Sequence, residues 1–151
     1  MRESILKQAL SRGLTDAQLD QSFDVGHRTL RATFEHMIFS VEVWTAAMAD
    51  QPDPAEGDDR SLAALRDRHE RSAAAFAAVA RRVRNEQRLD ETFLDPWIAS
   101  ATRRTFGGAI LHVMLHNTQH RTEALHILVR LGVPDLPDGD LKEWEQETLG
   151  I

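Results

Sequence analysis

The chain has 151 residues, of which 42% are hydrophobic and 28% charged, and its formal net charge is −6. This size and composition predict one compact domain over residues 1–151 and exclude a disordered chain. The 18 basic residues are spread along the sequence, which argues against nucleic-acid binding, because such proteins concentrate positive charge against the phosphate backbone.

The sequence contains no cysteine, which narrows the chemistry. Disulfides, thiolate metal sites and cysteine nucleophiles are excluded, so a transition metal must bind to imidazole and carboxylate. The segment 1–7 mixes both charge signs and does not resemble a signal peptide, and no window reaches the ~18 consecutive apolar residues of a membrane span. We therefore expect a cytoplasmic protein that does not enter membranes.

The N-terminal part predicts two short elements before a long helix. An amphipathic helix is expected over residues 3–10, and Thr15 with Gln18 three residues later predicts a capped turn or short helix. The first long helix is expected from about Val25 or His27 to Met48. It ends before residues 50–57, where proline, glycine and acidic residues indicate a loop.

Ser61 is a predicted cap for a second long helix that runs to about Asn85. Its inward face has residues at alternating spacings of three and four, including His69. The following segment 87–102 contains a proline and little periodicity, which predicts a long connection. Four of its apolar side chains are expected to pack against the helices: Phe93, Leu94, Trp97 and Ile98.

A third long helix is expected from near Thr105 to Leu131, because Gly132 and Pro134 provide a stop signal. A short helix is expected around residues 141–148. No strand pattern is found. Three long helices and a shorter one predict an all-α protein, with an antiparallel four-helix bundle as its architecture.

Three histidines, His112, His116 and His120, are spaced four residues apart on the third long helix. Residues at this spacing lie on one face, so neighbouring imidazoles can converge on one metal ion. His116 and His120 point inward, whereas His112 lies near the edge of the inward face. The best third ligand is His36, which has small and apolar neighbours on the first long helix, while His27 is expected on the opposite face of that helix.

Structural alternatives remain open for these residues. A single inward histidine is usually a hydrogen-bonded core residue, but burying three without partners costs roughly 1 to 3 kcal/mol for each unpaired nitrogen. His69 is interpreted as a structural or supporting histidine, and Trp44 as core packing or a pocket wall. Arg121 could hold an anionic group or pair with a carboxylate such as Glu123. The Glu-x-x-His pattern of di-iron bundles occurs once, at Glu123, instead of the required twice.

These residues make the sequence similar to the DinB-like family, which includes the damage-inducible DinB proteins of bacteria and thiol-dependent transferases and isomerases. The matching pieces are His36-Met37 followed by Trp44, and the motif Gly108-x-x-x-His112-Val113-x-x-His116-x-x-x-His120-Arg121. The resemblance implies a four-helix bundle, often a homodimer, with a divalent metal bound by His36, His116 and His120. One common variant has a histidine directly before the last ligand, where this chain has Gln119.

The function expected from this resemblance is that of a metal-dependent enzyme. Zinc or nickel are the favoured metals, with manganese or iron as alternatives. The preferred reaction is the transfer of a low-molecular-weight thiol to an electrophile, with the sulfur supplied by a cosubstrate because the chain has no cysteine. A hydrolase that activates water is the alternative, as is a non-enzymatic, metal-stabilised bundle. The candidate catalytic residues are His112, Arg121 and Glu123, and Glu35 is a further candidate base for hydrolysis.

Overall fold

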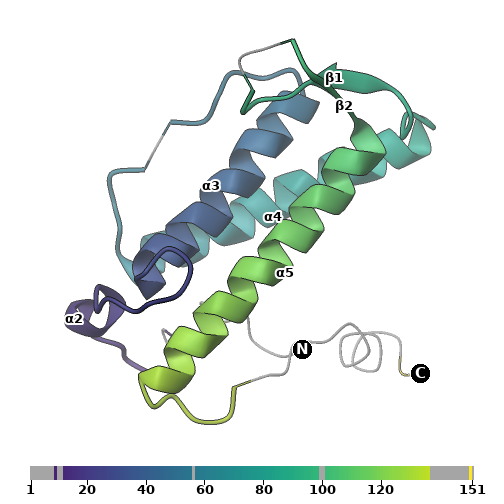
Figure 1. Ribbon diagram of the computed structural model, residues 1–151. Helices are drawn as coiled ribbons and strands as arrows, with labels where there is room; N and C mark the ends of the chain where they lie inside the picture. Colours follow the sequence, from purple (N-terminus) through teal and green to yellow (C-terminus); the bar gives the residue numbers. More distant parts are fainter. Residues whose placement is uncertain (1–8, 10–11, 56, 99–100, 137–149, 151) are drawn as a thin grey trace.

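The computed structural model describes residue 9 and residues 12–55, 57–98, 101–136 and 150 (Figure 1). This part of the chain is mostly helical, and no helix in it is both long and apolar enough to cross a membrane. The expected helix over 141–148 lies outside the described residues, as does that over 3–10 except for Ala9. The elements are the helices α2 (Asp16–Leu19), α3 (Leu30–Met48), α4 (Leu62–Asn85) and α5 (Phe106–Arg130), and the strands β1 (Thr92–Leu94) and β2 (Arg103–Thr105).

Side-chain caps define where the helices begin. Thr15 and Gln18 form the predicted capping box of α2, and the Ser61 hydroxyl accepts a hydrogen bond from the Ala64 amide at the start of α4, as predicted. Thr105 caps α5 in the same way by accepting from the Gly108 amide. The last helical residues, Asn85 and Arg130, also agree with the predicted ends.

The start of α3 differs from the prediction. The helix begins at Leu30, with Thr29 as its cap, and not at Val25 or His27. Gly26 and Arg28 both have positive φ, +48° and +71°, so the backbone enters the left-handed region and cannot continue a right-handed helix there. His27 therefore lies on a turn before the helix, and helical periodicity does not predict where its side chain points.

The three long helices are not all antiparallel to one another. In Figure 1, α3 and α4 run in the same direction, and α5 runs back against both. The connection 49–61 joins the end of α3 to the start of α4 and so has to return along the length of the bundle. It can reach roughly 40 Å when extended, whereas α3, with 19 residues, is about 28 Å long. The antiparallel order was expected as the simplest solution for these helices, but this connection is long enough to allow a parallel pair.

The segment after α4 forms a hairpin that the sequence did not predict. Thr92 pairs with Thr105 and Leu94 with Arg103 in antiparallel register. Phe93 packs against the helical core as expected, but Leu94 and Trp97 are more than half exposed, at 57% and 52%, and Ile98 is also exposed. Strands of three residues with few apolar side chains give no recognisable alternation, which explains why periodicity missed them.

The apolar core is divided into two clusters along the bundle. One contains Phe34 and Ile38 of α3 together with Ile127 and Leu128 of α5. The other contains Val41 and Trp44 of α3 and Val113 of α5, with Val79 and Val83 of α4. In the sequence, Ser40 of α3 and His116 and His120 of α5 lie between the two clusters, and His36 lies one turn before Ser40. The bundle therefore has a polar band at mid-height.

A buried arginine connects α2 to α3. The Arg31 side chain is only 5% exposed and donates hydrogen bonds to Asp20 at 2.8 Å, to Asp16 at 2.6 Å and to the Arg60 carbonyl. The hydrogen bond from Arg31 is the main reason that the pKa of Asp20 lies below its usual value. Because a buried guanidinium needs such partners, this contact fixes α2 and thereby one end of the segment that leads to His27.

Candidate metal centre

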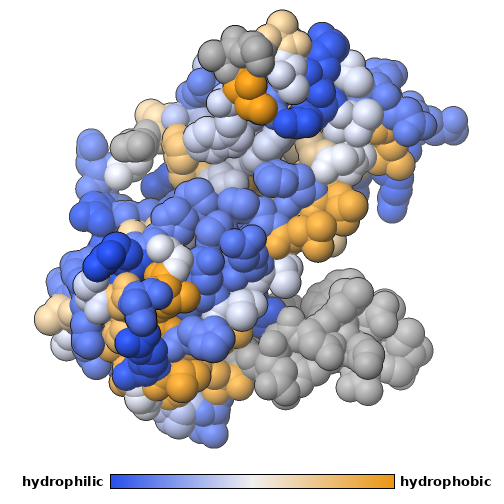
Figure 2. All heavy atoms as spheres, in the orientation of Figure 1, coloured by the Kyte–Doolittle hydropathy of each residue, from blue (hydrophilic) through white to orange (hydrophobic). Residues whose placement is uncertain are grey.

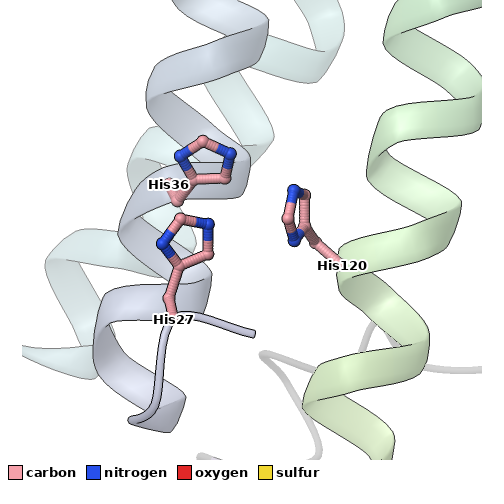
Figure 3. A group of neighbouring side chains, drawn as sticks. All are labelled: His27, His36 and His120. Carbon is pink, nitrogen blue, oxygen red and sulfur yellow. The ribbon is translucent and has the colours of Figure 1, made fainter. Parts of the chain in front are cut away.

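Imidazole rings from three parts of the chain meet in the polar band. His36 comes from α3, His116 and His120 from successive turns of α5, and His27 from the turn before α3. The rings of His27, His36 and His120 point toward one another across the space between α3 and α5 (Figure 3). Neighbouring ring centroids lie 4.4 to 5.0 Å apart, except for His27 and His36 at 3.9 Å.

The Nε2 atoms of the three predicted ligands lie close together. His116 Nε2 is 3.2 Å from His36 Nε2 and 3.1 Å from His120 Nε2. A ring nitrogen carries either one hydrogen or one lone pair in the ring plane, so His116 Nε2 cannot form good hydrogen bonds to both neighbours at once. Two nitrogens bound to one tetrahedral zinc ion at 2.0–2.1 Å lie roughly 3.3 Å apart, which is close to both separations. The donor set therefore fits a divalent metal better than it fits a hydrogen-bonded cluster.

A carboxylate holds His120 from behind. The Glu123 Oε2 atom lies 2.7 Å from His120 Nδ1, and His120 itself is buried. Because a carboxylate accepts a hydrogen bond, this contact places the ring hydrogen on Nδ1 and leaves the Nε2 lone pair directed at the centre. Glu123 was predicted as a catalytic candidate, and its position makes it a residue that orients His120.

Two further contacts shape the surroundings of these rings. Ser40 Oγ lies 3.5 Å from His116 Nδ1, at the outer limit for a hydrogen bond. Gly26 lies against Glu123, and a Cβ atom at that position would be 2.2 Å from Glu123 Oε2. A side chain there would push the Glu123 carboxylate away from His120, so the turn before α3 and this carboxylate pack directly against each other.

The prediction for His27 is wrong. It was expected on the face of the first helix opposite His36, but the two rings are in contact and tilted by 31°. The error follows from the start of α3, since His27 precedes the helix and its direction is set by the left-handed residues on either side. Ligand atoms of His27, His36 and His120 all lie within 4.8 Å of one another. The only sequence signal for this residue was Gly26, directly before it.

Burial and mutual repulsion lower the pKa values of His27, His36 and His116, which favours their neutral form. Burial, followed by the charges of His27, His120 and His116, lowers the pKa of His36 to about 4. Burial is also the largest cause of the lowered pKa of His27 and of His116. Neutral imidazole is the form that binds a metal, so near pH 7 these rings do not have to lose a proton first.

The remaining candidate residues lie around this cluster or away from it. His112 is exposed, with its ring 5.5 Å from His116 and 5.1 Å from Trp44, so it borders the cluster without joining it. Arg121 is half-buried directly after His120, and its catalytic role stays a prediction. His69 on α4 is half-buried, which lowers its pKa, and within the described residues no ring contact links it to the other histidines.

One cavity reaches the cluster at His36, and a second lies beside it at His112. A cavity of about 270 Å³ is lined by His36, Glu35, Phe39, Gly57, Arg60 and Arg68. A second, of about 600 Å³, is lined by residues that include His112, Trp44, Trp97 and Arg104. Both sizes suit small molecules rather than polymers.

A comparison with protein families gives a match to the DinB superfamily over residues 7–124. The chain belongs to the DinB superfamily. The matched range covers more than half of the sequence and includes all four clustered histidines and Glu123. A search of curated proteins finds no match. Membership in the DinB superfamily is compatible with divalent metal binding, and so is the group of His27, His36 and His120.

Proposed function

We propose that this DinB-superfamily chain is an enzyme that binds one divalent metal ion through His36, His116 and His120 and transfers a low-molecular-weight thiol to an electrophile. The observation that carries the metal site is the pair of short contacts at His116 Nε2, 3.2 Å and 3.1 Å, which hydrogen bonding alone cannot satisfy. Zinc and nickel are the preferred metals, because imidazole suits both, and manganese and iron are alternatives.

A bound divalent metal would lower the pKa of a thiol or water molecule that reaches it. The protein's own task is to hold the three imidazoles in place. Glu123 orients His120 through Nδ1, and Ser40 lies within reach of His116 Nδ1.

The nearby carboxylates already have hydrogen-bond partners, which favours thiol transfer over hydrolysis. Hydrolysis needs a general base that is free to take a proton from water. Glu35 accepts two hydrogen bonds from Arg60, at 2.5 and 2.9 Å, and Glu123 is occupied by His120. A thiol is far more acidic than water, so its activation depends less on such a base. Of the three predicted bases, only the exposed His112 has no hydrogen bond or ion pair from its side chain within the described residues.

The smaller cavity supports a small cosubstrate with an anionic group. It borders His36 and has the Arg60 and Arg68 guanidinium groups in its wall. Arginine binds carboxylates through paired hydrogen bonds, and both residues already bind carboxylates in this way, Arg60 to Glu35 and Arg68 to Glu42. A carboxylate-bearing thiol from a reducing cytosol could exchange with these glutamates, and we propose that compartment as the site of action.

The metal site can be tested by elemental analysis. Protein purified without an affinity tag or chelator should contain about one metal ion per chain, and the His36→Ala variant should contain almost none. Equal metal content in both proteins, or no metal in either, would reject the proposed centre.

The reaction needs a separate assay. A panel of low-molecular-weight thiols should be incubated with an epoxide or haloalkane, and thioether formation followed by mass spectrometry. We expect turnover by the metal-loaded protein that is lost in the His120→Ala variant. Ester hydrolysis without thioether formation would support the hydrolase instead, and metal-dependent stabilisation without any turnover would support a non-enzymatic bundle.

We also propose, from the family resemblance, that two copies of the chain associate. Leu111, Met114 and Leu115 on α5 are each more than half exposed, and Figure 2 shows apolar side chains gathered over this part of the helix. Exposed apolar patches of this kind commonly mark protein interfaces. Sedimentation analysis should give a dimer that the Leu115→Lys substitution dissociates; a monomeric wild type would reject this proposal.

A further inference from the structure

The centre contains one imidazole more than the three expected ligands. His36 and His120 are in ring contact with each other and with two flanking histidines, His116 and His27. Two sets of three can therefore be drawn, one with His116 and one with His27, and they share the same central pair. The second set has its ligand atoms within 4.8 Å of one another.

The turn that carries His27 is fixed at several points. The Phe23 side chain is buried in the core, and the Phe23 amide donates to the Arg28 carbonyl at 2.7 Å. Asp24 forms an ion pair with Arg130 at the end of α5, and Gly26 lies against Glu123. The position of His27 next to His36 is therefore set by contacts on both sides of it.

The backbone on either side of His27 is unusual. Arg28 has φ +71°, in a region that non-glycine residues rarely adopt and that costs about 1–3 kcal/mol unless the surroundings hold it. Such strained residues cluster at functional sites. Here the strain directs one side chain into the centre, since an ordinary helical start at this point would turn His27 away.

The ring of His27 has no other task within the described part of the chain. It forms no hydrogen bond there, although it is half-buried. Both of its nitrogens are therefore available to an ion without the loss of a hydrogen bond to the protein. An ion shared with His36 and His120 would satisfy one of the two nitrogens.

We propose that His27 is a fourth nitrogen ligand, so that the resting centre holds its metal with four imidazoles: His27, His36, His116 and His120. This inference rests on the proposed metal site and adds a ligand to it. Four neutral imidazoles complete a tetrahedral shell around zinc or cobalt(II). A cosubstrate would then have to compete with His27, the one ligand that is not on a long helix.

The test uses the full chain loaded with cobalt(II), whose visible absorption reports the number and geometry of its ligands. The His27→Phe variant keeps an aromatic ring against His36 but has no nitrogen donor. We expect its visible spectrum to change in position and intensity, and its metal affinity, measured by competition with a chromophoric chelator, to fall at least tenfold. X-ray absorption of the zinc-loaded proteins should count four imidazoles in the wild type and three in the variant.

His126→Ala is the matched control, because His126 is an exposed histidine of α5 outside the cluster, and its spectrum and metal affinity should equal those of the wild type. Unfolding of all three proteins with a chelator present checks that the turn still folds. If His27→Phe is folded and has the wild-type spectrum and affinity, His27 is not a ligand and this inference is overturned, while the three-histidine site stands. If the wild type binds no metal, the proposed function itself fails.

Discussion

The two sides of the histidine cluster are built in different ways. On one side, His116 and His120 are separated by one turn of α5, and any regular helix with this sequence would place them together. On the other side, His27 lies on a turn with two left-handed residues, held by Glu123 and Arg130 of a distant helix. The first side depends on local geometry, and the second depends on contacts between segments about a hundred residues apart.

The two sides of the cluster should respond differently to mutation. The helical side is supported by the whole of α5 and should lose only the function of the residue that is changed. The turn side is supported by a few specific contacts, so changes near His27 should disturb both the fold of the turn and the ligand that it carries. Substitutions on the two sides should therefore differ in how strongly they affect metal binding.

The largest effect is expected from His120→Ala. The His120 ring contacts the rings of all three other clustered histidines, His27, His36 and His116, so neither set of three ligands survives its removal. Elemental analysis of the purified variant should show almost no metal, and thioether formation should be lost. Retention of wild-type metal content would mean that the ion lies elsewhere.

A smaller effect is expected from His116→Ala. The group of His27, His36 and His120 remains in this variant and can still bind a metal ion, with weaker affinity. Titration with zinc in the presence of a competing chelator should place its affinity between those of the wild type and His120→Ala. Complete loss, equal to that in His120→Ala, would show that the turn side contributes nothing.

The carboxylate behind His120 should have an intermediate effect. Glu123→Gln keeps the size of the side chain but removes the charge that fixes the ring hydrogen on Nδ1. Loss of such a partner typically lowers metal affinity by about 10- to 100-fold. The same zinc titration measures the change. An unchanged affinity would leave Glu123 with a structural role only.

Gly26→Ala tests the contact between the turn and α5. The new Cβ atom would collide with Glu123, and φ +48° is unfavourable for alanine, so we expect a loss of about 1–3 kcal/mol in the free energy of unfolding. Gly13→Ala is the matched control, because Gly13 has φ +62° but no atom near its missing Cβ. Urea unfolding of both variants without metal separates the backbone penalty from the collision. Equal losses would show that Glu123 simply moves aside.

The smallest effect on metal binding is expected from His112→Ala. Its ring is exposed and borders the larger cavity, one turn beyond His116. Metal content and stability should stay at wild-type levels, within about 0.5 kcal/mol for an exposed position. A change in kcat or KM at constant metal content would support the predicted catalytic role, whereas loss of metal would place His112 in the centre.

The sequence by itself determined the three long helices, apart from the start of α3, and one side of the centre. Ser61, Thr105 and the Thr15–Gln18 box fixed helix starts, because capping uses side chains and amides only three residues apart. The spacing of His116 and His120 is equally local. His36 was placed correctly next to them because it lies well inside α3, where helical periodicity holds.

Only the tertiary structure decided the other side. The position of His27 depends on two left-handed residues and on the close approach of Gly26 to Glu123, and the role of Glu123 depends on the ring of His120. The parallel course of α3 and α4 and the hairpin pairing of Thr92 with Thr105 are also non-local. These features arise where distant segments restrict each other's backbone, and a periodic pattern along the chain carries no information about such restrictions.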